Sequence, residues 1–229
     1  MERAGECVLA RRLLIVAGVF VVLHLIVILT MGTSPAGSFF ANSLQIAASG
    51  IASAMAFGAA RRGRGLSRSL WLLVGFAWAT WGIANFGWTF YEVVLRVEPP
   101  ALSFVRFLFD IQGAFFAMAL FLDDARDSTR LDFATILDFL QIAAIYFLIY
   151  LVMFYLPSVS LDHHGAMRRV QFIMLIQNGA LIGLSVIRAG IARSPSTKAL
   201  YRNFAIFLAI YCSLAQVTEF VQYLREMSK

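Results

Sequence analysis

The stretch Trp71–Leu95 reads WLLVGFAWATWGIANFGWTFYEVVL and carries a single charged residue, Glu92. An α-helix needs about twenty apolar residues to cross the hydrocarbon core of a bilayer. The strands of a membrane barrel would instead alternate apolar and polar residues in segments of about ten. This continuous run therefore predicts a transmembrane helix.

The composition extends this prediction to the whole chain. Of its 229 residues, 60% are hydrophobic and 14% are charged, whereas soluble domains have roughly 45–50% and about 25%. A soluble fold of this size could not bury so much apolar surface. We therefore expect an all-α integral membrane protein with a single transmembrane domain over residues 1–229, and we exclude disordered chains and disulfide scaffolds.

Six further apolar runs resemble the first, so the sequence predicts a bundle of seven transmembrane helices. Turn signals separate several of them, including Gly32–Ser38, Pro99-Pro100 and Pro157. The predicted spans are Leu13–Met31, Ala41–Ala60, Leu70–Leu95, Leu102–Phe121, Phe133–Tyr155, Val170–Ile191 and Asn203–Leu224.

The basic residues orient these spans. Most of the 19 Lys and Arg residues lie in the N-terminal tail or in the second, fourth and sixth loops, as Arg3, Arg11, Arg12, Arg61, Arg62, Arg64, Arg68, Arg126, Arg130, Arg188, Arg193, Lys198 and Arg202. Cytoplasmic loops carry such an excess. We expect a multi-pass protein of the bacterial inner (plasma) membrane, with a cytoplasmic N-terminus and an external C-terminus. The net charge of +6 then reflects topology and lipid headgroups, and nucleic acid is not an expected partner.

Two alternatives concern the ends of the chain. Arg11-Arg12, an apolar run and Ser34-Pro35-Ala36 are also typical of a cleaved signal peptide. A seven-span chain whose C-terminus is external cannot reach a cytoplasmic domain without another crossing. The chain therefore works alone or with a partner, or it is a fragment that lacks an eighth span.

The third span holds all four tryptophans of the chain: Trp71, Trp78, Trp81 and Trp88. At about 100° per residue they share an arc of roughly 100° with Asn85 and Glu92. This stripe predicts either packing between helices or the wall of a cavity for a small ligand with an apolar body and a polar group. Gly75 and Gly82 lie beside it and allow a neighbouring helix to approach closely.

Polar residues in other spans add candidates for the same ligand site. Arg106 and Asp110 are four residues apart, so they share a helix face and can form an ion pair. Ionisable residues inside a membrane are costly and often functional. Gln177, Asn178 and Glu219 lie at similar depth or in the outer half. The predicted ligand site therefore comprises Trp78, Trp81, Asn85, Trp88, Glu92, Arg106, Asp110, Gln177, Asn178 and Glu219 in the outer half of the bundle.

The sequence predicts neither an enzyme nor a resident cofactor or metal. Its lysines, Lys198 and Lys229, lie outside the last span, so a retinal Schiff base is not expected. One intramembrane histidine, His24, is too few for paired haem ligands. There is also no nucleophile elbow and no P-loop.

Two segments carry a family resemblance. Trp71–Leu95, followed by Pro99-Pro100 and by LDDARDSTRLDFATILDFLQIAAIYFLIYLVMFYLP at Leu122–Pro157, resembles the multi-span sensor regions that precede GGDEF diguanylate cyclase or histidine kinase domains in bacteria. The shared elements are the Trp- and Gly-rich helix that ends in Tyr-Glu, the proline-marked outer loop and the helix start at Leu137–Ile142. The sequence has no GGDEF or kinase motif.

The resemblance implies a signal-input module without its output domain, which would act through a cytoplasmic or membrane signalling partner. From the polar and aromatic residues of the spans, we expect this module to bind a small, partly apolar ligand or a membrane lipid. Two other functions stay open. One is a small transporter or channel, which needs a continuous polar path across the bundle. The other is a non-catalytic subunit of a membrane complex, assembled through the small-residue ridge of Gly50, Ala54 and Gly58.

Overall fold

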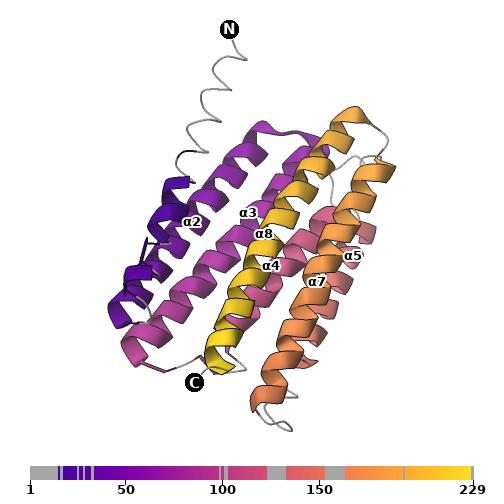
Figure 1. Cartoon of the computed structure of the whole chain (residues 1–229). Coiled ribbons are helices and arrows are strands. Elements are labelled where there is room, and N and C mark those ends of the chain that lie inside the picture. The colour runs from indigo at the N-terminus through magenta and orange to yellow at the C-terminus, as the bar shows by residue number, and fades with distance from the viewer. Residues whose placement is uncertain are drawn as a thin grey trace.

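The chain is described by a computed structural model that is helical throughout its regular elements (Figure 1). The described residues are 15, 18–24, 26–27, 29–31, 34–97, 99–100, 103–122, 133–152, 163–192 and 194–227. At 35, 133–135, 163–174 and 214–227 the description covers the backbone only. The predicted all-α fold is confirmed.

The described residues of the first predicted span are helical. After it, the described part of the chain forms six α-helices and the π-helix η1. Consecutive α-helices run in opposite directions, so the α2–α3 and α7–α8 turns lie at the same end of the bundle (Figure 1). The elements are α2 (Pro35–Arg62), α3 (Gly65–Thr89), the π-helix η1 (Phe90–Leu95), α4 (Phe104–Leu120), α5 (Phe133–Tyr150), α7 (His163–Ile191) and α8 (Pro195–Met227).

Several helices are longer than the predicted spans, because helices continue beyond their apolar stretches to a capping residue. α2 begins at Pro35 rather than at residue 41, and α8 begins at Pro195 rather than at residue 203. The residue before each proline is a serine whose hydroxyl accepts a hydrogen bond from a backbone N–H. Ser34 accepts from Gly37 at 3.1 Å, and Ser194 accepts from Thr197 at 3.0 Å. Proline suits the first helical position, and serine is a favoured N-cap. α7 likewise begins at residue 163, not 170.

α2 and α3 form a closely packed hairpin. Gly65, after the short turn, has a φ of 52°, which favours glycine. A Cβ on Gly75 would lie 2.7 Å from the Phe57 ring, and the hydroxyl of Ser53 donates to the carbonyl of Gly75 at 3.0 Å. A Cβ on Gly82 would likewise meet a side chain of α2 at 2.8 Å. The predicted close approach at these two glycines is confirmed.

The small-residue ridge of α2 lies on a different face. Gly50 and Ala54 are exposed, and a Cβ on Gly50 would have no atom within 4 Å among the described residues. α2 packs on α3 through Ser49, Ser53 and Ala56 instead, which are buried. The predicted ridge therefore has an exposed half at Gly50 and Ala54, whereas Gly58 is half-buried.

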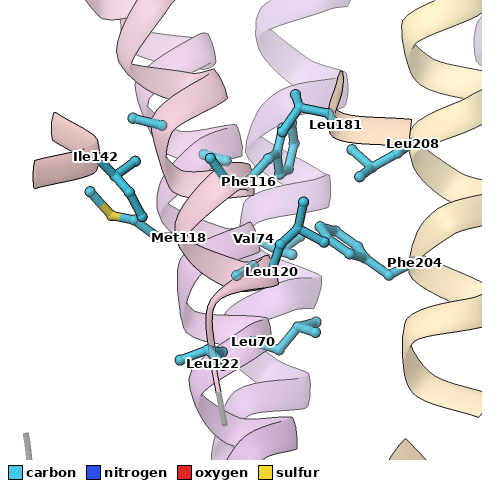
Figure 2. Close-up of a cluster of buried hydrophobic side chains, with 14 of the residues drawn as sticks. Leu70, Val74, Phe116, Met118, Leu120, Leu122, Ile142, Leu181, Phe204 and Leu208 are labelled. Carbon is cyan, nitrogen blue, oxygen red and sulfur yellow. The ribbon is translucent and has the colours of Figure 1, made fainter. Parts of the chain in front are cut away.

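α4 is the central helix and is buried on several faces. Its apolar half joins a core cluster with α3, α5, α7 and α8. Figure 2 shows Phe116 and Leu120 of α4 between Val74 of α3 and Phe204 of α8. Large apolar side chains therefore fill the centre of this half of the bundle.

The carboxyl end of α4 is held by α7 and α8. The hydroxyl of Tyr201, which is fully buried, lies 3.0 Å from the carbonyl oxygen of Leu122 and 3.3 Å from that of Ala119. The guanidinium of Arg188 donates to the same Leu122 carbonyl and lies 5.3 Å from the centre of the Tyr201 ring. The last carbonyls of a helix have no partner within it and carry partial negative charge. Tyr201 and Arg188 supply donors and a positive charge there.

Two helices, Ala36–Arg62 and the run Gly65–Leu95, are long and apolar enough to cross a membrane. Shorter apolar helical stretches occur at Gly18–Met31, Ile136–Tyr150 and Leu175–Ile191. These five stretches are identified by their length and composition alone.

We expect Tyr201→Phe to lower the free energy of unfolding by about 1 kcal/mol, because a buried carbonyl loses its neutral donor while Arg188 keeps one bond to the same group. Thermal or denaturant unfolding of the purified full chain measures this. Tyr91→Phe, at the half-buried tyrosine of η1, is the matched control. An equal effect of both substitutions would contradict a role for Tyr201 at the end of α4.

Candidate functional site

Two tryptophans of the predicted stripe pack against aromatic rings of α4 and α8. The Trp78 ring lies 5.4 Å from that of Tyr211 and 6.3 Å from that of Phe207. The Trp81 ring lies 4.8 Å from that of Phe109 and 6.3 Å from that of Tyr211. All four pairs are edge-to-face, the arrangement that ring quadrupoles favour. The stripe therefore lies at the interface of α3 with α4 and α8.

These rings belong to a larger group, which we call the aromatic cluster: Trp78, Trp81, Phe116, Phe207 and Tyr211. Phe116 of α4 lies 5.8 Å from both Phe207 and Tyr211, and these two stack at 6.0 Å. Phe207 and Tyr211 are four residues apart, so they project from one face of α8. The cluster thus joins three helices that are distant in sequence.

Gln112 of α4 places an amide group against this cluster. The Tyr211 hydroxyl donates to Oε1 of Gln112 at 2.9 Å. Gln112 is only 3% exposed, and its Nε2 has no hydrogen-bond partner among the described residues. A buried donor without an acceptor costs about 1–3 kcal/mol. Gln112 therefore offers a free amide NH2 group, with two N–H donors, beside a set of aromatic rings.

Sequence reasoning did not include Gln112 or Tyr211 in the site. The signal was present, because Gln112 is an uncharged polar residue in the middle of an otherwise apolar stretch of the fourth span. The charged residues Arg106 and Asp110 of the same span are the stronger signals of a polar site, because charged side chains cost more to bury. That Tyr211 reaches Gln112 depends on the packing of α8, which sequence does not give.

Trp88 and Asn85 continue the stripe toward the other end of α3. The Arg106 guanidinium lies 5.4 Å from the centre of the Trp88 ring, a cation–π distance. Nε of Arg106 donates to the carbonyl of Pro99 at 3.3 Å. Asn85 is 5% exposed and its Nδ2 donates to the carbonyl of Trp81 at 3.0 Å, within its own helix. Arg106 therefore links α4 to α3 and to the proline-marked loop.

Glu92 does not join the aromatic cluster. It is exposed, and its Oε2 accepts a hydrogen bond from Nδ2 of Asn42 on α2 at 2.9 Å. The stripe was projected at the angle of a regular α-helix, but the chain forms the π-helix η1 from Phe90 onward. A π-helix has a wider turn than an α-helix, so the angular position of Glu92 differs from the predicted one.

Asp110 lies on another face of α4 and is 3% exposed. Its Oδ2 has no hydrogen-bond partner among the described residues. Arg106 contacts Trp88 and Pro99, and its positive charge is also within electrostatic range of the predicted partner Asp110. Tyr146 and Tyr150 of α5 are within electrostatic range of the Asp110 carboxyl group.

The remaining predicted residues divide between α7 and α8. Gln177 is half-buried, and its Nε2 lies directly against Gly113 of α4. Asn178, the next residue on α7, is also half-buried. Glu219 belongs to α8, but its side chain lies outside the described residues. Of the predicted residues, the tryptophans thus pack against α4 and α8, Gln177 lies against α4 near Asp110, and Glu92 lies apart from both on the α2 side.

No group of three or more His, Cys, Asp or Glu side chains that could hold a metal occurs within the described ranges. One face of α4 presents an amide donor among aromatic rings, and another presents an unpartnered carboxyl oxygen near tyrosines.

We expect Tyr211→Phe to lower the free energy of unfolding by about 1–2 kcal/mol, because it leaves Oε1 of Gln112 buried without its donor. Gln112→Leu in the Tyr211→Phe background should recover part of this loss, because it removes both unpartnered amide atoms. Denaturant unfolding of the single and double variants gives the coupling between the two positions. Additive losses would show that the two side chains do not interact.

Comparisons with protein-family models, with curated proteins and with solved structures found no match.

Proposed function

We propose that the chain is a multi-pass integral membrane protein whose seven helices form one transmembrane domain. The support is the distribution of side chains, which is the reverse of that in a soluble bundle. Large apolar residues face outward on several helices, among them Phe86 at 66%, Leu140 at 61% and Ile187 at 58% exposed. Polar residues such as Asn85 and Gln112 are buried. Exposed apolar patches of such extent mark a surface that contacts lipid or protein.

The basic residues support the proposed orientation. Arg61, Arg62, Arg64, Lys198 and Arg202 are associated with the α2–α3 and α7–α8 turns, which lie at one end of the bundle (Figure 1). We call this the basic end. Positively charged loops stay in the cytoplasm, so the basic end is the cytoplasmic side in this proposal, and the end that carries Glu92 and Arg96 faces outward.

Within this membrane domain we propose a sensory, signal-input function. The observation that carries the proposal is Nε2 of Gln112, a buried donor without a described partner beside the aromatic cluster. A small, partly apolar ligand with a hydrogen-bond acceptor, such as a carbonyl oxygen on a flat ring, matches this chemistry. Its ring would replace ring–ring contacts and its oxygen would accept from Gln112. The resemblance to bacterial sensor regions agrees with this function.

The contacts of α8 suggest how such a signal could reach the basic end. Tyr211 contacts Gln112 at the cluster, and Tyr201 on the same helix contacts the end of α4. A ligand changes an equilibrium only if it binds one packing better than another. A ligand that displaces Tyr211 from Gln112 would favour a shifted α8 and thereby alter the contacts at the basic end.

A transporter or channel is less well supported. Such a protein needs a polar path through the bundle, but the half that contains Leu70, Val74 and Leu120 is filled by the apolar core cluster (Figure 2). Among the described residues, the two unpartnered polar atoms of α4 are not followed by further unpartnered polar atoms of α4 in this apolar half.

The topology is tested with single cysteines placed at Arg64 and at Val97 in a chain from which Cys7 and Cys212 have been removed. We expect a membrane-impermeant maleimide to label the position-97 cysteine in intact cells and the position-64 cysteine only after lysis, because the α2–α3 turn is cytoplasmic in the proposal. Labelling of both in intact cells would contradict the orientation. Extraction of the chain from membranes by alkaline carbonate would contradict the membrane proposal itself.

Ligand binding is tested with decyl-benzoquinone, which carries acceptor oxygens on a flat apolar ring. The full chain in lipid nanodiscs should show saturable quenching of tryptophan fluorescence. We expect Gln112→Leu to weaken the apparent affinity about 10-fold, which corresponds to about 1.4 kcal/mol. Gln141→Leu, at an exposed glutamine of α5, should bind as the wild type does. Equal affinity of all three proteins would contradict a ligand site at Gln112.

A further inference from the structure

Asp110 is a second buried polar group that the proposed ligand site does not use. It lies on α4 only two residues before Gln112, so the two side chains point about 200° apart around the helix. The residue is 3% exposed, and Oδ2 has no hydrogen-bond partner among the described residues. Buried carboxylates are normally paired or bind a metal ion. The unpartnered Oδ2 of Asp110 is therefore available to bind a further group.

The surroundings of Asp110 come from α5 and α7. One turn later on α4, the position that a Gly113 Cβ would occupy lies against Nε2 of Gln177 and 3.1 Å from the hydroxyl oxygen of Tyr146. Gly113 and Asp110 are three residues apart, so they share a helix face. The carboxyl of Asp110, the phenol of Tyr146 and the amide of Gln177 therefore converge from three helices.

Within the described residues, the charged and titratable groups around Asp110 and Tyr146 are Arg106, whose positive charge attracts the Asp110 carboxylate, Tyr150, and Cys212 of α8. Arg106 lies one turn earlier on α4, with its guanidinium at Trp88 and its Nε bonded to Pro99. From α5, Tyr146 and Tyr150 are the titratable groups in range, and the Tyr150 hydroxyl donates to the carbonyl of Ser103 at 3.2 Å. From α7, Gln177 contributes a neutral amide. The group of Asp110, Tyr146 and Gln177 thus carries at most one negative charge.

The space is small. A methyl group at Gly113 would collide with Gln177 and with the Tyr146 ring, whose Cε1 would lie 2.7 Å away. An organic ligand does not fit between α4, α5 and α7 at this level without separating them. A single compact cation needs far less room, and hard cations prefer oxygen ligands such as carboxylate, phenol and amide oxygens.

We propose that Asp110, with Tyr146 and Gln177, binds one small monovalent cation, either a proton or a sodium ion, between α4, α5 and α7. The single negative charge matches a monovalent rather than a divalent ion. Ionisable groups buried in membrane proteins often mark ion or proton sites. Occupation of this site neutralises Asp110 and favours the close packing of the three helices, whereas an empty site leaves a buried carboxylate whose Oδ2 has no hydrogen-bond partner among the described residues.

The test is the unfolding temperature of the full chain in detergent micelles, followed by tryptophan fluorescence. One series lowers the pH from about 9 to about 5, around the range where folded proteins are usually most stable. A second series, at fixed pH and ionic strength, replaces choline chloride by sodium chloride. We expect the unfolding temperature to rise by at least about 2–4 °C in one of the series. A rise with falling pH identifies a proton, and a rise with sodium identifies a sodium ion.

Asp110→Asn has nearly the same shape without the charge and should abolish the response, with an unfolding temperature at least equal to that of the unoccupied wild type. Tyr146→Phe and Gln177→Leu should weaken a sodium response. Asp138→Asn, at an exposed aspartate of α5, should respond as the wild type does. If Asp110→Asn does not fold, the infrared carboxyl band of the wild type, followed over the same pH range, still reports whether a buried carboxyl takes up a proton.

A wild type that responds to neither pH nor sodium would overturn the proposal, and so would an Asp110→Asn variant that retains the response. Neither result depends on quinone binding at Gln112. The experiments therefore test the cation-site proposal and the sensory-ligand proposal independently of each other.

Discussion

The burial of α4 on several faces is the constraint on which the rest of the arrangement depends. This helix contacts α3, α5, α7 and α8, and its polar residues Asp110 and Gln112 have no access to solvent. Three neighbouring helices place polar groups around them: Tyr211 of α8 donates to Gln112, Tyr146 of α5 is within electrostatic range of Asp110, and Gln177 of α7 lies against Gly113. The positions of the outer helices are thus tied to α4 by polar as well as apolar contacts.

Much of the fold could be predicted because it follows from local patterns. The apolar runs gave the helices from residue 35 onward, and Gly75 and Gly82 indicated close packing with a neighbour. Helix starts were less well predicted, since Pro35 and Pro195 begin helices among polar residues that hydropathy does not recognise. The number of membrane crossings is a property of the chain in a bilayer, and it stays a prediction.

The site could be predicted only in part, for reasons that are specific to individual residues. Trp78 and Trp81 share a face because an α-helix is regular, and this part of the prediction describes their placement well. Glu92 departs from it because the helix becomes a π-helix at Phe90. The spacing of Arg106 and Asp110 allows an ion pair, but Trp88 and Pro99 offer Arg106 contacts that spacing cannot reveal. Gln112 matters through Tyr211, a residue 99 positions away.

The shortness of α4 has a consequence for how such a chain would be made. Its 17 residues extend about 25 Å at about 1.5 Å per residue, less than the hydrocarbon thickness of about 30 Å. It also carries Arg106 and Asp110, and a charged residue near the centre of a span opposes insertion by the translocon by about 2.5–3.5 kcal/mol. Such a segment is a poor substrate for insertion one helix at a time. If the chain spans the membrane as proposed, α4 would enter the bilayer together with the long, apolar α2–α3 hairpin, which is synthesised first and offers α4 a surface on which to pack.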